Sequence, residues 1–371
     1  MRKSIQIMFA AMMAVTGYAQ TGLKNVIGDD CLIGVAVNVC QSSGADTAAT
    51  RVVRKHFNSL VAENCMKAEA VQPMEGIFYF RDADQFVAYA EENGAAPIGH
   101  CLVWHSQAAQ WMFSMADGRP ASRELLIERM RQHIVALVER YRGRVKGWDV
   151  VNEAFNDDGT MRRSPWHDII GPDFIELAFR FANEADPDAE LYYNDYSMAG
   201  AAKREAVCRM VRDFKKKGVR IDAVGMQSHN GLTWPDLGSY EVTIDSLAAC
   251  GVKVMISELD INMLPQPAGF GGAEVSQNYE YDKTMNPYAD GLTDEMAAQV
   301  EARWMELFGI YRRHRHQISR ICFWGVGDGD SWLNNWPIKG RTAYPLLFDR
   351  QYKEKPVVKR IMDLYRQSDR H

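Results

Sequence analysis

The chain has 371 residues, and its 43 basic and 48 acidic side chains give a formal net charge of −5. This balance offers no basic surface for nucleic acid or for an anionic membrane, so it favours a neutral substrate. The length would allow two domains, but barrels of about 250 to 400 residues routinely fold as one. A single large domain is therefore compatible with the length.

The first residues have the pattern of a secretory signal peptide. Arg2 and Lys3 supply positive charge, residues 5–15 form an apolar run, and the small residue Ala19 ends the segment. The run is shorter than the roughly 20 apolar residues that a spanning helix needs, and Cys31 lies too far downstream to carry a lipid. We therefore expect a signal peptide over residues 1–19, export to the periplasm or the extracellular space, and no membrane anchor.

The cysteine pattern predicts neither disulfides nor a zinc site. Seven cysteines follow the predicted cleavage point, so at least one is unpaired. Several fall inside apolar, strand-like runs, where a free thiol behaves as a small buried hydrophobe. A large core needs no disulfide support, and the sequence has no CxxC pair or close Cys/His cluster of the kind that binds zinc.

Short apolar runs alternate with longer amphipathic segments, which is typical of repeated βα units around a parallel sheet. Eight strands are predicted, at residues 31–39, 59–64, 96–104, 147–153, 190–195, 222–229, 253–261 and 320–325. Residues 123–141 have a helical pattern capped by Ser122, Pro172 is expected in a first helical turn, and Gly218 and Gly251 are expected at helix ends. The alternation predicts an α/β fold, a single (β/α)8 TIM barrel over residues 20–371.

One irregular stretch, residues 262–291, follows the seventh predicted strand and is rich in Gly, Pro, Asn and Tyr. A long loop at that end of a barrel is more often functional than accidental. The alternative is a tolerated surface insertion.

Two acids follow apolar runs in the fourth and seventh predicted strands: Glu153, preceded by Asn152, and Glu258, preceded by Ser257. Barrel active sites are built at the C-terminal ends of strands, so the two carboxyl groups are expected to face each other across the mouth. Such a pair is the minimum equipment for breaking a glycosidic bond. The alternative, that each acid pairs with an Arg or Lys, is weakened because both acids have the same setting.

Further motifs accompany these acids in order along the chain. They lie at residues 57–58, 62–64, 66–67, 99–107, 148–154, 193–196, 225–229, 257–260, 323–325, 328, 331–332, 345–349 and 355–356. Together they resemble the glycoside hydrolase family 10 xylanases over nearly all of the chain that follows residue 19. The resemblance implies an endo-1,4-β-xylanase that hydrolyses xylan without a cofactor, and we expect a monomer.

The resemblance assigns Glu153 as acid/base and Glu258 as nucleophile in a retaining mechanism with a covalent glycosyl-enzyme intermediate. Retention requires carboxyl groups roughly 5–5.5 Å apart. Burial and the charge of Glu258 are expected to raise the pKa of Glu153, so that it begins the reaction protonated.

Supporting roles follow from the same resemblance. A hydrogen-bonded chain from Asp260 through His229 is expected to hold the nucleophile ionised. The remaining supporting residues are Asn152 and Gln227, expected to contact the sugar 2-hydroxyl and the nucleophile, and His100 and Asp149, expected behind them. No metal is expected.

Seven residues are expected to bind substrate: Glu63, Asn64, Lys67, Trp104, Gln107, Trp324 and Trp332. The first three follow the second strand and are expected to bind hydroxyl groups of the glycone sugar. The tryptophans offer apolar faces to pyranose rings, although core packing is the alternative. In the family, residues matching Gln107 and Trp324 crowd the position of a glucose hydroxymethyl group, which favours xylan over cellulose.

Three other functions stay open at this stage. A retaining barrel glycosidase for β-glucan or mannan would keep both glutamates. A non-catalytic carbohydrate-binding barrel would need neither acid. A barrel aldolase or phosphate-binding enzyme would want a strand-end Lys or a Gly-rich anion loop near the last strands, and neither is evident.

Overall fold

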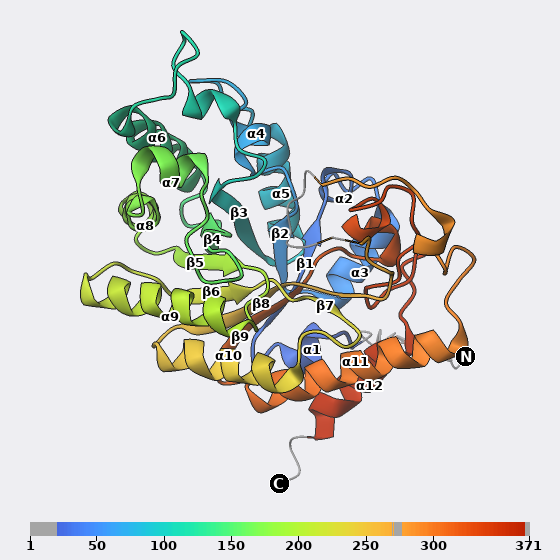
Figure 1. Cartoon of the computed structure of the whole chain (residues 1–371). Helices are drawn as coiled ribbons and strands as arrows, with labels where there is room; N and C mark the ends of the chain where they lie inside the picture. The colour runs from blue at the N-terminus through green and yellow to red at the C-terminus, as the bar shows by residue number, and fades with distance from the viewer. Residues whose placement is uncertain (1–20, 269, 271–276, 368–371) are drawn as a thin grey trace, which may run out of the picture.

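The computed structural model describes residues 21–268, 270 and 277–367, and the predicted signal peptide lies outside them (Figure 1). Strands occupy the centre of the molecule and helices lie around them. The strands are β1 (Leu32–Val37), β2 (Ser59–Ala62), β3 (Ala96–Trp104), β4 (Gly147–Asn152), β5 (Glu190–Asp195), β6 (Ala223–Met226), β7 (His229–Gly231), β8 (Lys253–Asn262) and β9 (Ile318–Phe323).

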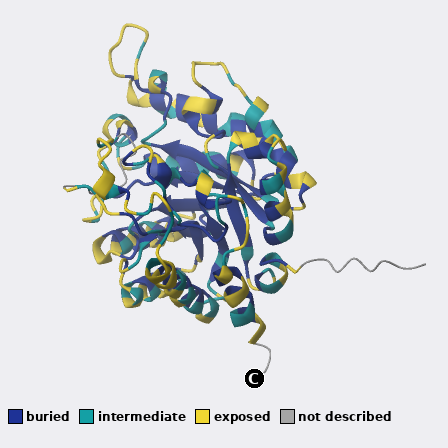
Figure 2. Cartoon of the chain, turned by 90° about the vertical axis from the view of Figure 1, so that its right-hand side faces the viewer, coloured by how far each residue is buried: buried dark blue, intermediate teal, exposed yellow. Residues whose placement is uncertain are grey.

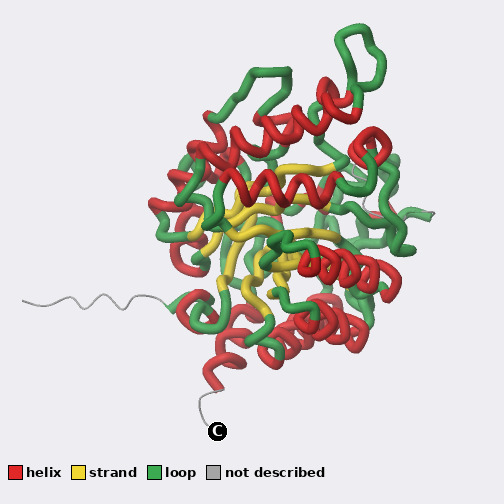
Figure 3. The backbone as a smooth tube through the Cα atoms, turned by 90° about the vertical axis from the view of Figure 1, so that its left-hand side faces the viewer, coloured by secondary structure: helices red, strands yellow, loops and turns green. Residues whose placement is uncertain are grey.

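Helices precede, connect and follow the strands, and Figure 3 shows them on the outside of the tube of strands. The α-helices are α1 (Lys24–Ile27), α2 (Val39–Ser42), α3 (Thr47–His56), α4 (Ala68–Val71), α5 (Arg81–Glu92), α6 (Arg123–Arg140), α7 (Pro165–Ile170), α8 (Phe174–Ala185), α9 (Ala201–Lys216), α10 (Leu237–Ala249), α11 (Asp294–Arg313) and α12 (Pro356–Arg366). The 3₁₀ turns are η1 (Gln110–Phe113), η2 (Lys283–Met285), η3 (Asp328–Asp330) and η4 (Trp332–Asn334).

The sheet is parallel and closes on itself. Each strand from β1 to β5 pairs with the next, β9 pairs with β1 and with β8, and the pairing of β6 with β8 completes the ring. β7 continues the path of β6 and pairs with the later half of β8. In the described residues this makes a barrel of eight strand positions, which confirms the predicted (β/α)8 fold.

The sixth predicted strand, residues 222–229, is wrong as one continuous strand. Residues 227–228 leave the extended conformation, with Ser228 at φ 65°, and the chain resumes pairing at His229. A residue with a positive φ lies outside the extended region of the backbone and cannot continue a β-ladder. The interruption separates β6 from β7 and turns this segment toward the barrel mouth.

Two hydrophobic layers hold the barrel. Its interior is filled by residues contributed by most of the strands, a typical barrel core: Ala36, Val61, Ile98, Tyr192, Ala223, Met255, Cys322 and Trp324. A second, larger core lies between the outer face of the strands and the helices. Figure 2 shows the strands buried and the exposed residues confined to helix surfaces and loops.

Most helix boundaries follow the sequence signals. The Ser122 hydroxyl accepts a hydrogen bond from the Leu125 N–H and caps α6. Gly218 and Gly251 follow α9 and α10 with φ of 65° and 78°, the left-handed conformation that ends a helix. The placement of Pro172 in a first helical turn is wrong, because Asp173 is the N-cap of α8 and Pro172 precedes it.

All seven cysteines are free thiols, as predicted. In the described part of the chain no helix is both long and apolar enough to cross a membrane. The described residues of the 262–291 loop pack against the segment after η4. There the Tyr279 N–H donates to the Pro337 carbonyl at 2.9 Å, and the Thr342 N–H donates to Asn286 Oδ1 at 2.8 Å.

Gly99 in β3 is a position where a single methyl group should destabilise the barrel. A Cβ there would lie 2.0 Å from the ring of Trp148, which is fully buried in β4. We expect Gly99→Ala to lower the free energy of unfolding by about 1–3 kcal/mol, because overpacking forces side chains and backbone to shift. Thermal unfolding monitored by circular dichroism measures the effect.

Gly309→Ala is the matched control. Gly309 lies inside α11 and a Cβ there would meet only the end of the Arg313 side chain at 3.6 Å. Alanine is the better helix former by roughly 0.8–1 kcal/mol, so the melting midpoint should rise. Equal shifts in the two variants would contradict the packing argument.

Candidate active site

A cavity of about 220 Å³ lies at the C-terminal ends of the strands. Its lining residues are Glu63, Asn64, Lys67, His100, Trp104, Gln107, Asn152, Glu153, Gln227, His229, Glu258, Trp324, Trp332 and Trp336. Every predicted site residue except Asp149 and Asp260 is among them. The structure therefore brings together residues that are spread over more than 270 positions of the sequence.

Irregular strand pairing aims the second glutamate into this cavity. β8 pairs with β9 at Ile256 and again at Leu259, while β9 advances by only two residues between these pairs. Side chains of a regular strand alternate with a period of two, so residues three apart face opposite sides. Met255 and Glu258 are three residues apart, so in a regular strand they would face opposite sides. Because β8 has one extra residue between them, Met255 faces the barrel interior and Glu258 also faces inward, into the cavity. A similar shift follows Asp149 in β4.

Glu153 directly follows β4, and its backbone is fixed by several hydrogen bonds. Its φ is 59°, a left-handed conformation that costs free energy for a residue with a Cβ. Its N–H donates to the Asn194 carbonyl at 2.8 Å, and its carbonyl accepts from Arg162 Nε at 3.0 Å. The next N–H, of Ala154, donates to the Tyr193 hydroxyl at 3.0 Å. The surrounding contacts thus hold a strained residue in one orientation.

The carboxyl group of Glu153 is buried and accepts three side-chain hydrogen bonds. Trp104 Nε1 donates to Oε2 at 2.9 Å, and Gln227 Nε2 donates to Oε1 at 2.8 Å. Asn152 Nδ2 also donates to Oε1, at 3.1 Å. Only 4% of the residue is exposed, so its ionised form loses most of its hydration.

Burial raises the pKa of Glu153 to about 7. The negative charges of Asp195 and Glu258 act in the same direction, while the hydrogen bonds from Gln227 and Trp104 partly oppose it. Glu153 therefore carries a proton in mildly acidic solution, as an acid catalyst must.

Glu258 is equally buried but has the opposite surroundings. Burial alone would raise its pKa, but hydrogen bonds from His229 and Asn194 and the charges of His100 and His229 together lower it. Asn194 Nδ2 donates to Oε1 at 2.6 Å, and His229 Nε2 lies 3.2 Å from Oε2. Glu258 is therefore ionised where Glu153 is protonated.

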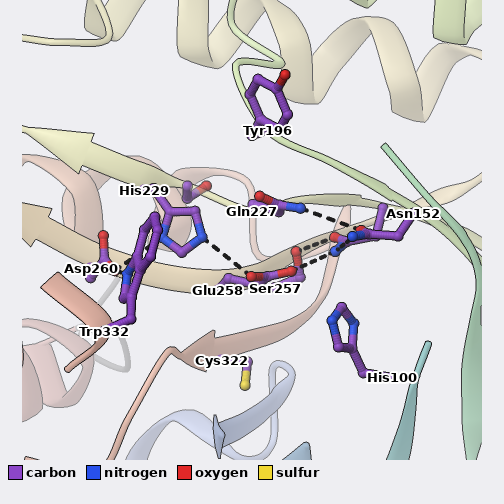
Figure 4. A network of polar contacts seen from close by, with 12 residues as sticks. His100, Asn152, Tyr196, Gln227, His229, Ser257, Glu258, Asp260, Cys322 and Trp332 are labelled. Carbon is purple, nitrogen blue, oxygen red and sulfur yellow. Dashed lines mark hydrogen bonds and ion pairs between the residues drawn. The ribbon is translucent and has the colours of Figure 1, made fainter. Parts of the chain in front are cut away.

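The predicted hydrogen-bonded chain behind Glu258 is present (Figure 4). His229 Nδ1 lies 2.9 Å from Asp260 Oδ2, and Trp332 Nε1 donates to the same oxygen at 2.8 Å. Burial would lower the pKa of His229, but the charge of Asp260 and the bonds to both carboxylates outweigh it and raise the pKa to about 10. A charged imidazole thus faces the nucleophile candidate.

The prediction that the side-chain amides of Asn152 and Gln227 contact the nucleophile is wrong, and their contact with the sugar 2-hydroxyl stays a prediction. Both amides donate to Glu153, and Asn194 is the amide that contacts Glu258. Asn194 Nδ2 also donates to Asn152 Oδ1 at 2.9 Å, so the two asparagines link the two carboxyl groups. Asn194 was not predicted as a site residue, although its position next to last in the predicted strand 190–195 is a signal that could have pointed to it.

The residues expected to bind the glycone sugar form one cluster. Lys67 Nζ donates to Asn64 Oδ1 at 2.9 Å and to Gln107 Oε1 at 2.8 Å, and it lies 4.9 Å from the Trp104 ring. Burial lowers the pKa of Lys67 and raises that of Glu63. The cluster offers charged and amide groups beside an aromatic face, a combination suited to sugar hydroxyl groups.

Asp149 lies behind the cavity wall, as predicted, whereas His100 is itself part of the lining. His100 Nδ1 is 2.9 Å from Asp149 Oδ2, and both residues are 2% exposed. The imidazole meets the Trp324 ring edge-on, with the centroids 5.3 Å apart. Asp149 thus orients a histidine that itself supports an aromatic wall of the site.

Trp336 was not predicted as a site residue. It stacks on Trp332 with ring centroids 4.5 Å apart and planes inclined by 18°, and its edge meets Phe270 at 5.3 Å. Two tryptophans four positions apart were visible in the sequence, but that spacing alone does not indicate a sugar site.

Lys203 was also missed. The residue is fully buried, with Nζ 3.0 Å from Asp195 Oδ1, 2.9 Å from Asp157 Oδ1 and 3.7 Å from the centre of the Tyr196 ring. Its cation balances Asp195, which also accepts a hydrogen bond from the Tyr193 hydroxyl. No sequence signal distinguishes this lysine from the others of α9.

A second cavity of about 650 Å³ adjoins the first and shares His229, Trp332 and Trp336 with it. It is lined from the ends of β5, β7 and β8, on the side of the site that carries Tyr196. Figure 4 shows Tyr196 standing apart from the polar network around Glu258. The two cavities therefore adjoin at His229, Trp332 and Trp336, and the catalytic candidates line the smaller one.

In this arrangement the protonated carboxyl group of Glu153 can donate a proton and the ionised carboxylate of Glu258 can act as a nucleophile. These are the two roles that cleavage of a glycosidic bond requires. Within the residues that the structure describes, no group of three or more His, Cys, Asp or Glu side chains is placed to hold a metal ion.

Comparison with known proteins agrees with this chemistry. The sequence model of glycosyl hydrolase family 10 matches residues 22–364. Endo-1,4-beta-xylanase A of Xylanibacter ruminicola is 52% identical over 368 residues, which cover 98% of this chain and 100% of that protein. An endo-1,4-beta-xylanase of Geobacillus stearothermophilus is 38% identical over 350 residues, 92% of this chain and 98% of that protein.

Among solved structures, a GH10 endoxylanase retrieved from a sugarcane soil metagenome superposes with a TM-score of 0.89 at 42% identity, and covers 92% of this chain and 100% of that chain. The intracellular xylanase TsXylA of Thermoanaerobacterium saccharolyticum, in a mutant complex with xylotriose, gives a TM-score of 0.79 at 34% identity over 92% of this chain and 98% of that chain. The chain belongs to glycosyl hydrolase family 10.

Proposed function

We propose that the protein is a retaining endo-1,4-β-xylanase that cleaves internal bonds of xylan. The observation that carries this proposal is the pair of buried glutamates in one strand-end cavity, with the pKa of Glu153 raised to about 7 and that of Glu258 lowered. The relatives named above support xylan as substrate, since both curated relatives are endo-1,4-beta-xylanases.

In the first step, Glu258 attacks the anomeric carbon while Glu153 gives its proton to the leaving glycosidic oxygen. A covalent glycosyl ester forms and the glycosidic bond breaks. The hydrogen bonds from His229 and Asn194 hold the nucleophile in position before the substrate arrives, so little reorganisation is needed at the moment of reaction.

In the second step, a water molecule attacks the same anomeric carbon and restores its original configuration. Formation of the ester removes the negative charge of Glu258, one of the causes that raise the pKa of Glu153. Glu153, now ionised, accepts the proton of the water. One carboxyl group thus serves first as acid and then as base.

The nucleophile assignment predicts the outcome of Glu258→Ala. We expect this variant to fold and to lose hydrolysis, because no other carboxylate occupies that position. Added azide or formate should restore part of the turnover with inverted product, since a small anion fits the space that the side chain leaves. Polarimetry or NMR of the product measures the configuration, and rescue with retained product would assign the nucleophile elsewhere.

If Glu153 is the acid catalyst, kcat/KM should fall on the alkaline side of its pH profile, and the effect of removing Glu153 should depend on the leaving group of the substrate. Because Glu153 must begin protonated, kcat/KM on xylo-oligosaccharides should fall as the pH rises through about 7. Glu153→Ala should lower kcat/KM on these substrates by about 10²–10⁴-fold but affect activated aryl xylosides far less, because they need little protonation.

This fall in kcat/KM at alkaline pH should be absent from the residual activity of Glu153→Ala on aryl xylosides. Equal losses on both substrate classes, or an alkaline fall that survives the substitution, would remove Glu153 from the acid role.

Preference for xylose over glucose is proposed to come from crowding by Gln107 and Trp324, which both line the small cavity. The double variant Gln107→Gly with Trp324→Ala should raise kcat/KM on aryl cellobioside relative to aryl xylobioside by about 10- to 200-fold, the range expected when a pocket discriminates one small group. An unchanged ratio in a folded variant would shift the preference to Glu63, Asn64 and Lys67. Parallel assays on xylan and soluble cellulose separate this proposal from a β-glucan specificity.

A further inference from the structure

The 650 Å³ cavity lies on the leaving-group side of the bond to be cleaved. The residues expected to bind the glycone, among them Lys67 and Gln107, line the small cavity and are absent from the large one. The two cavities meet at His229, Trp332 and Trp336, beside the catalytic pair. A chain that fills both is therefore cut at their junction, and its departing part lies in the large cavity. This step rests on the proposed function.

One exposed aromatic side chain stands in this cavity. Trp234, in the turn between β7 and α10, is 49% exposed, which is unusual for so large a hydrophobic group. The other large hydrophobic side chains that are exposed in the described residues do not line the cavity. They are Val39, Met74, Ile77, Tyr79, Val242 and Tyr281.

The turn that carries Trp234 is rigid. The Trp234 carbonyl accepts a hydrogen bond from the Gly231 N–H at 2.7 Å. The buried Arg303 of α11 donates to the Gly231 carbonyl at 3.2 Å and to the Pro235 carbonyl at 2.5 Å, so it fixes both ends of the turn. Asp236 then caps α10 by accepting the Ser239 N–H at 2.8 Å. The exposed ring is presented on a fixed backbone, which lowers the entropy that binding must overcome.

Another part of the cavity wall is also fixed by a buried arginine. Trp336 stacks on Trp332 and meets Phe270, and both Trp336 and Phe270 line the cavity. The buried Arg341 donates to the Pro265 carbonyl and to the Trp336 carbonyl, each at 3.0 Å. Arg341 thus links the start of the 262–291 loop, at Pro265, to the backbone of Trp336.

The charges of the cavity indicate a neutral occupant. Its described lining includes no arginine or lysine. Its two carboxylates already have cationic partners, Asp157 with Lys203 at 2.9 Å and Asp260 with His229 at 2.9 Å. The side chains of Asn262 and Gln266 offer amides that can bind hydroxyl groups. Lys203 and His229 are each shared with a second carboxylate, Asp195 and Glu258, so the described lining has no unpaired cation. Aromatic faces beside amides, without a cation to bind a carboxylate, suit a neutral sugar chain rather than a uronic acid.

We propose that Trp234 is an outer sugar-binding platform on the leaving-group side, on which a neutral xylose unit of the departing chain stacks, beyond the unit attached to the scissile oxygen. The 650 Å³ volume accommodates more than one sugar. Trp234 binds the chain at a distance from the reacting atoms, so it acts as a specificity-determining residue for long substrates and takes no part in bond cleavage.

The test compares a long with a short leaving group in the full-length protein. Xylohexaose can reach Trp234, whereas the aryl group of 4-nitrophenyl β-xylobioside ends near the scissile bond. In Trp234→Ala, the ratio of kcat/KM for xylohexaose to that for the aryl glycoside should fall about five- to tenfold, the effect of losing one aromatic stacking contact. The loss should appear mainly in KM, and Trp234→Tyr should restore most of it.

Tyr79→Ala is the matched control, because Tyr79 is 56% exposed but lies outside the cavity. Its ratio should equal that of the unaltered protein. The inference is overturned if the Trp234→Ala ratio stays within twofold of the unaltered protein, or if Tyr79→Ala lowers the ratio equally. Activity of the unaltered protein on neither substrate would overturn the proposed function, and this inference with it.

Discussion

Two carboxylic acids share one buried cavity, and the protein must keep one of them protonated and the other ionised. Both are about equally buried, at 4% and 5% exposed, so burial alone would raise both pKa values. The difference comes from their partners. Glu258 faces the charged His229, which Asp260 holds in place, whereas the Glu153 carboxyl group accepts its hydrogen bonds from the neutral side chains of Trp104, Gln227 and Asn152. Much of the polar structure at the strand ends serves this asymmetry.

The barrel provides the rigidity that this asymmetry requires. Glu153 keeps a left-handed backbone because Asn194, Arg162 and the Tyr193 hydroxyl bind the peptide groups around it. Tyr193 in turn donates to Asp195, whose charge is balanced by the buried Lys203. The same aspartate contributes to the raised pKa of Glu153. A network that looks purely structural therefore also affects the protonation of the acid.

The sequence predicted the barrel and the two glutamates because apolar runs that end in polar residues mark strands and their C-terminal ends. The resemblance to family 10 xylanases supplied most of the other cavity residues. The sequence could not predict which amide would touch which carboxylate, since that depends on side-chain orientations across neighbouring strands. Regular alternation from Met255 would even have placed Glu258 on the outer face, and only the bulge in β8 turns it inward. The positive φ of Ser228, which divides the sixth strand, has no signature in the sequence either.

Chemistry and chain recognition are built on different parts of the fold. The two glutamates and their partners stand on or directly beside strands, whose positions the closed sheet fixes. The wide leaving-group side depends on irregular segments, which a barrel can change without disturbing its core. These segments still need fixed geometry to bind a sugar chain, and buried Arg303 and Arg341 supply it by binding loop carbonyls. Loops fixed in this way can set which chains bind while the strand ends keep the same reaction.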